Sequence, residues 1–215
     1  MKLLFLSLLF MLLQSCCNNE NRTVLVSNTV NDSLKKESII FSKINVEVNG
    51  HQWKYEWNHF ISSEIEKNKN IFINNDSLYK NDIYKLCPNY YNLKEKEKIT
   101  FWTLLIASIS KYESNFDTNC RFREGESLNY VYSEGLLQLS YGDELRYDIP
   151  LNTQEKNILI PEINLKSGVI ILAKQLKVKK TIFTTKSYYW SVLTKKQNEI
   201  IIFFKKNIKE LNICE

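Results

Sequence analysis

Residues 92–117 read NLKEKEKITFWTLLIASISKYESNFD, and this stretch sets the architecture of the chain. Asn92 followed three positions later by Glu95 is typical of a capping box, which satisfies the first backbone N–H groups of a helix. Apolar side chains then recur every three or four residues, which is the spacing of one buried helical face. These side chains are Ile99, Trp102, Ile106 and Ile109. The stretch therefore predicts a long helix that begins near Asn92 and packs into the core.

The next position of this apolar series is a glutamate, Glu113. Burial disfavours the charged form of a carboxyl group and so raises its pKa. A carboxyl group that keeps its proton near neutral pH can serve as a general acid. Most helical glutamates are solvated instead, and Glu113 could bend out to water or pair with Lys111 or Arg123. Glu113 is the candidate catalytic acid of the chain.

The composition fits one well-buried core. The chain has 215 residues, of which 44% are hydrophobic and 25% charged, and this excludes low-complexity, collagen-like and wholly disordered chains. With only 5 Gly and 3 Pro, we expect a mostly helical domain rather than a β-sandwich. The formal net charge of +5 is scattered, which argues against a nucleic-acid partner. It is compatible with an anionic polymer such as a bacterial cell wall, or with a lysine-rich solvated surface.

The N-terminal segment has the pattern of an export signal. Lys2 precedes an apolar run over residues 3–13, which has the length of a signal-peptide core and is too short to span a bilayer as a lasting helix. The run ends in Leu13-Gln14-Ser15-Cys16, which resembles a bacterial lipobox. The resemblance implies removal of residues 1–15 and acylation of Cys16; the alternative is ordinary secretory cleavage to a soluble protein.

Three further segments follow the signal. Residues 16–43 are dominated by Asn, Ser, Thr, Val and Lys, and we interpret them as a flexible tether because they can bury little apolar surface. Residues 44–86 form a helical extension, in which Trp53 and Trp57 indicate a helix that caps the core or extends a groove. Residues 87–215 form the main domain.

The cysteines of the main domain favour a disulfide over a metal site. Cys87, Cys120 and Cys214 have no CxxC spacing and no histidine nearby, so we expect no zinc. A Cys87–Cys120 bond is preferred because both residues flank the same predicted helix. Buried thiols are the alternative.

Two more motifs follow the helix of residues 92–117. Residues 133–140 read SEGLLQLS, and residues 161–172 read PEINLKSGVIIL. Together with Glu113-Ser114, and in this order and spacing, they resemble the soluble lytic transglycosylase family, relatives of goose-type lysozyme. The resemblance runs from about Cys87 to Leu193. It implies a mostly α, lysozyme-like single domain, in which the third motif forms a helix that packs behind the sugar groove.

The resemblance also implies roles for individual residues. In the family the glutamate of the Glu-Ser pair is the catalytic acid, so the role falls on Glu113. The substrate-binding residues implied are Ser114, Gly135, Leu136, Gln138 and Tyr189. Gly135 would let the backbone approach the glycan, although it could be a plain turn glycine. Gln138 could donate and accept hydrogen bonds to an acetamido group, or it could be a surface amide.

The chain departs from the family pattern at three places. One is the stretch before Ser133, including Tyr130 and Tyr132, where the family varies in length and no role can be carried over. Leu137 stands where the family usually has Met, a swap that conserves volume. The late Tyr-Asn-x-Gly motif is replaced by Tyr188-Tyr189-Trp190-Ser191, and we favour Tyr189 as the tyrosine that reaches Glu113. Of the tyrosines near the motifs, we expect one or two at the groove. They are Tyr130, Tyr132, Tyr141, Tyr147 and Tyr189.

The activity that the resemblance implies is cleavage of peptidoglycan without a cofactor. Glu113 protonates the leaving oxygen and then, as a base, deprotonates the C6 hydroxyl of N-acetylmuramic acid, which closes a 1,6-anhydro ring. A nucleophile already tethered to the electrophile makes a second protein carboxylate dispensable. None of the candidates for such a carboxylate stands out, and we interpret Asp117 as a loop feature and Glu134 as solvated. The candidates are Asp117, Glu124, Glu126, Glu134 and Asp143.

Two alternatives stay open, a hydrolytic muramidase and a peptidoglycan-binding lipoprotein without catalysis. In either case we expect an exported monomer that faces the periplasm, anchored by lipid in the outer rather than the inner membrane. Two more helices are predicted to pack on the core. Residues 164–176 carry Leu165, Val169, Leu172 and Leu176 on one face, and residues 200–204 belong to a terminal helix.

Overall fold

The computed structural model describes residues 47–48, 50–125, 131–186 and 188–214. The signal segment 1–15, Cys16 and the tether 16–43 lie outside these residues, as do Glu126 and Tyr130. Within the described part of the chain, no helix is long and apolar enough to cross a bilayer.

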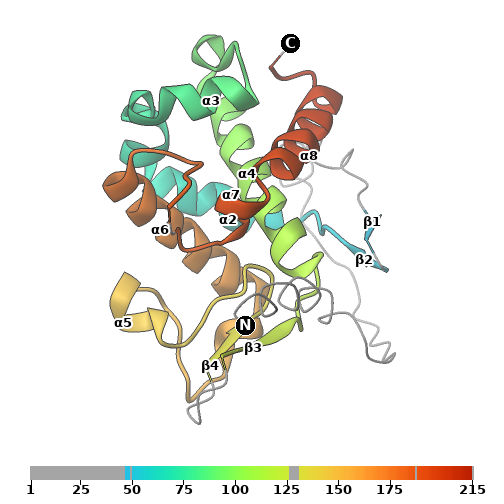
Figure 1. The fold of residues 1–215 in the computed structure, drawn as a ribbon, viewed down its shortest axis with the longest axis vertical. Helices are drawn as coiled ribbons and strands as arrows, with labels where there is room; N and C mark the ends of the chain where they lie inside the picture. The colour runs from blue at the N-terminus through green and yellow to red at the C-terminus, as the bar shows by residue number, and fades with distance from the viewer. Residues whose placement is uncertain (1–46, 49, 126–130, 187, 215) are drawn as a thin grey trace, which may run out of the picture.

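A central helix organises the molecule, as the sequence predicts. Helix α4, Glu95–Ser114, runs through the middle of the fold, and its side chains from Thr100 to Ser110 are buried (Figure 1). It begins at Glu95 rather than near Asn92, because the Lys94 backbone N–H donates to Glu97 Oε2 at 2.7 Å. The cap therefore lies two residues later than predicted. Asn92 ends a separate 3-10 turn, Tyr90–Asn92.

Two of the longer helices pack directly on α4, and a third packs on one of these two. Helix α2, Trp57–Lys67, packs against both α4 and α6, and α8, Gln197–Glu210, packs against the other side of α4 (Figure 1). Helix α6 is Pro161–Lys179. The predicted inward face of α6 is confirmed, since Leu165, Val169, Leu172 and Leu176 have no exposed surface. The predicted terminal helix is confirmed as α8.

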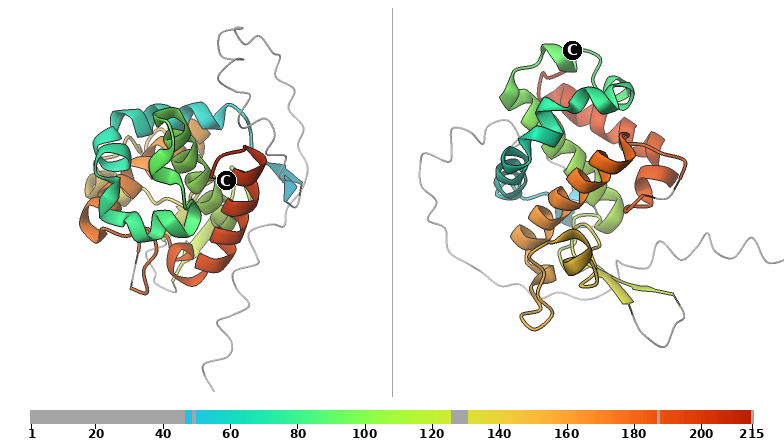
Figure 2. Two further views of the ribbon diagram at one scale, coloured as in Figure 1. Left: turned by 90° about the horizontal axis from the view of Figure 1, so that it is seen from above. Right: turned by 90° about the vertical axis from the view of Figure 1, so that its left-hand side faces the viewer.

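Short elements complete the fold. The antiparallel hairpin of β3 and β4 pairs Arg121 with Glu134 and Glu124 with Val131, and it projects from the helical body in the right-hand view of Figure 2. The strands are β3, Arg121–Glu124, and β4, Val131–Glu134. A second two-stranded pair consists of β1, Glu47–Val48, and β2, His51–Gln52. The remaining short helices are α3, Lys80–Leu86, α5, Asp143–Tyr147, and α7, Val192–Lys195. Irregular turns lie at Asn70–Asn74, Asp76–Tyr79 and Asn157–Leu159.

The two early tryptophans belong to the core. Trp53 and Trp57 are buried, with ring centroids 5.1 Å apart in an edge-to-face arrangement. Trp53 also meets Phe116, just beyond the end of α4, at 5.4 Å. The extension therefore caps the central helix, and neither tryptophan lines the groove described below.

The predicted cysteine pairing is wrong. The disulfide joins Cys87 to Cys214, whose Cα atoms are 5.0 Å apart, while Cys120 is buried outside this bond. The reason is tertiary, because α8 packs against α3 and so returns the C-terminal segment to the residue that follows α3. Spacing along the chain does not reveal this return.

Removal of this disulfide is expected to lower stability. The bond closes a loop with a sequence separation of 127, and cross-links of long loops strongly restrict the unfolded chain. Cys214→Ser is expected to lower the free energy of unfolding by about 3 kcal/mol in urea titrations. A reductant should lower the wild-type value by a similar amount and leave the variant unchanged. Wild-type stability that is insensitive to reductant would contradict the assignment.

Candidate active site

A groove of about 1190 Å³ runs past the C-terminal end of α4. Its walls come from that helix end, the β3–β4 hairpin, residues 138–147, the last turns of α6 and residues 188–196. These segments are far apart in sequence, and Figure 1 shows the hairpin and α5 below the end of α4. Glu113, Ser114, Gln138 and Tyr189 of the predicted site all line the groove.

Glu113 lies in the last turn of α4. The helix ends directly after it because Asn115 adopts a left-handed conformation, with φ of 52°. The Glu113 side chain is half-buried, and its Oε1 atom is buried without a hydrogen-bond partner among the described residues. The predicted inward orientation of this carboxyl group is therefore observed.

The surroundings of Glu113 raise its pKa to near neutrality. Burial raises its pKa from 4.5 to about 7, and the charge of Glu124 adds to this increase. The charge of Lys196 and a hydrogen bond from the Val192 backbone act in the opposite direction. Burial is the largest of these effects, so the carboxyl group can carry a proton at the pH at which a general acid would use it.

This raised pKa predicts a pH-dependent cost to stability. The pKa of Glu113 is higher in the folded than in the unfolded state. The contribution of its protonated form to the free energy of unfolding is therefore complete below about pH 4.5 and is lost as the pH rises through about 7. Glu113→Gln removes the titration. Between pH 5 and pH 8 its free energy of unfolding is expected to rise by about 2 kcal/mol relative to wild type. Urea titrations at both pH values measure this, and an equal difference at both would contradict it.

Gln138 lines the groove, and its side-chain oxygen is the atom that a ligand could reach as an acceptor. Its Nε2 donates to the Cys120 carbonyl at 3.0 Å and to the Gly135 carbonyl at 2.9 Å, which uses both amide hydrogens. The expectation that Gln138 also donates to a ligand is therefore wrong for this arrangement. Oε1 is left as the atom that can accept a hydrogen bond.

Gly135 and Leu136 lie behind the groove wall, outside its lining. Gly135 has φ of +77°, and a Cβ atom there would lie 2.5 Å from Asn164 Nδ2. The position therefore requires glycine for the turn and for close packing. The Leu136 carbonyl accepts from Ser114 Oγ at 2.9 Å, so Ser114 ties the end of α4 to this turn.

Asn164 on α6 holds the same turn from the other side. The Leu137 backbone N–H donates to Asn164 Oδ1 at 2.9 Å, while Nδ2 donates to the Glu134 carbonyl at 3.1 Å and the Ile158 carbonyl at 2.9 Å. A Cβ atom at Gly168 would lie 2.1 Å from Leu137 Cδ1. The three sequence motifs thus meet in one packed unit behind the groove.

Tyr189 lines the groove, but its hydroxyl is directed at Asp143 rather than at Glu113 as favoured. Its hydroxyl donates to Asp143 Oδ2, and burial with the Asp143 charge raises the pKa of Tyr189, which keeps it protonated. Tyr188 donates to the Thr181 carbonyl at 3.3 Å. This segment approaches Glu113 instead through the Val192 backbone and Lys196. Tyr189 packs edge to face on Trp190, with centroids 4.9 Å apart, and forms part of the groove wall.

Two of the remaining acidic residues line the groove, and two do not. Asp143 and Glu124 are lining residues. Asp117 accepts from the Asn119 backbone N–H at 2.8 Å, which fits its interpretation as a loop feature. Glu134 is not solvated as expected, because it is 8% exposed and lies 3.3 Å from Arg121 Nε.

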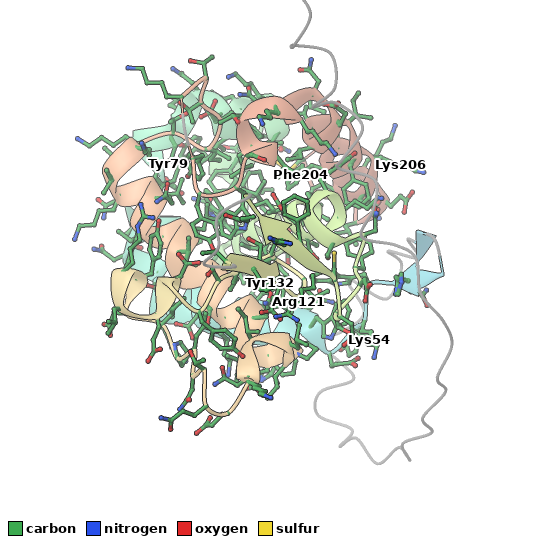
Figure 3. The ribbon with its side chains drawn as sticks, turned by 60° about the horizontal axis from the view of Figure 1, so that its bottom comes forward. Lys54, Tyr79, Arg121, Tyr132, Phe204 and Lys206 are labelled. Atoms are coloured by element: carbon green, nitrogen blue, oxygen red, sulfur yellow. A yellow bond between two sulfur atoms is a disulfide. The ribbon has the colours of Figure 1, made fainter. Side chains whose placement is uncertain are left out.

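Glu124 is the functional candidate that sequence reasoning left undistinguished. It is the last residue of β3, and its Oε1 accepts a hydrogen bond from Ser133 Oγ of β4. The sequence feature that could have identified Glu124 is its position at the end of a short strand, shortly after the Glu-Ser pair. Of the other tyrosines, Tyr147 lines the groove. The ring of Tyr132 lies beneath the Arg121 guanidinium on the hairpin, at 3.7 Å (Figure 3). The Tyr141 hydroxyl accepts from the Ile158 N–H at 3.1 Å.

Within the described ranges, no cluster of three or more His, Cys, Asp and Glu could hold a metal ion.

The structure has a buried central helix with a glutamate in its last turn, beside a groove edged by a small hairpin. This architecture is a lysozyme-like fold. The chain is similar to three solved structures of DslA from Bdellovibrio, with TM-scores of 0.62, 0.58 and 0.57 and sequence identities of 24%, 24% and 23%. Each match covers 74% of this chain and 91% of the DslA chain. One of the three is wild type, and two carry a glutamate-to-glutamine change, at positions eleven apart in DslA. No protein-family model and no curated protein matches the chain.

Proposed function

We propose that this protein is a lytic transglycosylase that cleaves the bond between N-acetylmuramic acid and N-acetylglucosamine in peptidoglycan. The single observation that carries the proposal is Glu113, a carboxyl group with a raised pKa and a buried oxygen at the wall of a large groove. The groove volume of about 1190 Å³ exceeds that of most small-molecule pockets, which suits a polymeric substrate. The motifs quoted above for the soluble lytic transglycosylase family support the same assignment.

In the proposed reaction Glu113 acts twice. It first donates its proton to the glycosidic oxygen as that bond breaks, while the acetamido group of N-acetylmuramic acid stabilises the positive charge that develops at C1. The resulting carboxylate then removes the proton of the C6 hydroxyl, whose oxygen bonds to C1 and closes the anhydro ring. Lys196 helps to stabilise the carboxylate between the two steps, since its charge lowers the pKa of Glu113.

Glu124 favours a second candidate, a hydrolytic muramidase. Glycosidases that use water employ two carboxyl groups, one of them as an acid and the other as a base or nucleophile. Glu124 lines the same groove as Glu113, and its charge raises the pKa of Glu113. The two glutamates are eleven positions apart, which is also the spacing of the two glutamates replaced in the DslA variants.

The products of sacculus digestion distinguish the candidates. The full-length protein should release muropeptides one water lighter than hydrolytic products, and Glu124→Gln should still release them. Hydrolytic products that disappear in Glu124→Gln would favour the muramidase. Asp117→Asn, a change outside the groove, serves as the matched control. Binding to sacculi with no release would contradict both candidates and favour a wall-binding lipoprotein.

We further propose that the chain is exported and anchored by lipid at Cys16, where it faces the periplasm. The support is the signal-like run of residues 3–13 and the lipobox-like ending. The mass of the mature N-terminus tests this proposal. An unmodified N-terminus elsewhere would contradict it.

A further inference from the structure

We propose that the groove selects glycan strands whose muramyl residues carry peptides with free carboxylates, through the cationic side chains that line it together with Glu113. This inference rests on the proposed function and adds the charge of the substrate to it. The glycan backbone of peptidoglycan is largely neutral, so its peptide stems are the part that a positive field can distinguish from other amino-sugar polymers.

Five cationic side chains line the groove, and they come from two sides of it. Arg146 and Lys179 come from α5 and α6, which pack against each other. The other three come from the end of α4 and from α7 with the residue after it, which also pack together. They are Lys111, Lys195 and Lys196. A strand lying in the groove would therefore meet cations carried by both pairs of elements.

The acidic residues of the groove offset only part of this positive charge, because five cationic side chains share the lining with the three carboxyl groups of Glu113, Glu124 and Asp143. Asp143 is buried and accepts from Tyr189 and from the Ser140 backbone N–H at 3.0 Å. Glu124 accepts from Ser133 on the hairpin. Lys179, Lys195 and Arg146 are exposed, and in the described part of the chain none of them forms an ion pair with a carboxylate. Their charges are directed to solvent or to a ligand.

Lysines at the rim suit mobile peptide stems better than they suit sugar rings. A sugar ring needs fixed donors and acceptors close to its hydroxyl groups, whereas a flexible anionic stem is attracted by a field without a fixed geometry. Such a contribution acts on encounter and binding and weakens with salt. It should therefore change KM and leave kcat nearly unchanged.

The test compares strands that differ only in charge. Soluble strands with intact peptides are prepared in two forms, native and with their carboxylates converted to methylamides. Wild-type full-length protein is expected to cleave the native form with a KM about fivefold lower, and added salt should remove the difference. The double substitution Lys179→Gln and Lys195→Gln should raise KM for native strands about fivefold and leave cleavage of amidated strands unchanged.

The matched control removes the same charge elsewhere. Lys177→Gln with Lys206→Gln changes two exposed lysines outside the groove lining, and Lys206 lies on α8 away from the hairpin (Figure 3). This control should behave as wild type on both substrates. Equal KM for native and amidated strands in wild type would overturn the inference and leave the proposed function intact. Cleavage of neither substrate would overturn both.

Discussion

Glu113→Gln is expected to reduce strand cleavage by at least about a thousandfold, with little change in binding to sacculi. Glutamine has the shape of glutamate but has no acidic proton to donate, and a positioned general acid contributes about 10²- to 10⁴-fold to a rate. Here the same carboxyl group is proposed to act in both steps, so no other group remains to replace it. Muropeptide release from sacculi measures the rate, and pelleting with sacculi measures binding.

Glu66→Gln is the matched control for this substitution. Glu66 is exposed on α2, outside the groove, so the same chemical change there should leave the rate unaltered. Release by Glu113→Gln at the wild-type rate would refute the assignment of the acid.

The pH profile tests the same assignment without a mutation. In the proposed reaction the protonated form of Glu113 starts the cleavage, and burial raises the pKa of this group to about 7. The cleavage rate should therefore fall about tenfold for each pH unit above that value, as the acid loses its proton. A rate that rises between pH 7 and pH 9 would contradict this role.

Asn164→Leu is expected to lower the free energy of unfolding by about 4 kcal/mol. The side chain satisfies one N–H and two carbonyls of the surrounding backbone, and Asn164 is 1% exposed. Each buried polar group that loses its partner costs about 1–3 kcal/mol. Leucine has a similar volume, so the loss is caused by the unmatched polar groups rather than by a cavity. Urea titration measures the difference.

The comparison variant is Asn207→Leu. Asn207 is also buried, but among the described residues its Nδ2 donates to a single acceptor, the Phe203 carbonyl of its own helix, at 2.7 Å. The expected loss there is about 1 kcal/mol. Equal losses at the two positions would show that Asn164 does not hold the turn as described.

Local patterns in the sequence were enough for the main helices and for the acid. The three-and-four spacing of apolar residues that ends at Glu113 requires one face of α4 to point inward, and the same rule places the inner face of α6. The helix start was shifted by two residues, because Glu97 rather than Asn92 provides the cap. Alternative caps a few residues apart have similar energies, so the sequence does not choose between them.

Contacts between distant segments decided the rest. Cys87 pairs with Cys214 because α8 returns the C-terminal segment to α3, and Tyr189 binds Asp143 rather than Glu113 because of where residues 188–192 cross the groove. Glu124 enters the groove because its hairpin folds across the end of α4. Periodicity encodes only which face of an element is apolar, and it carries no information about which remote side chains that face will meet. The sequence alone thus determined the central helix and its buried acid, and the tertiary structure alone decided the charges and carboxylates that surround it.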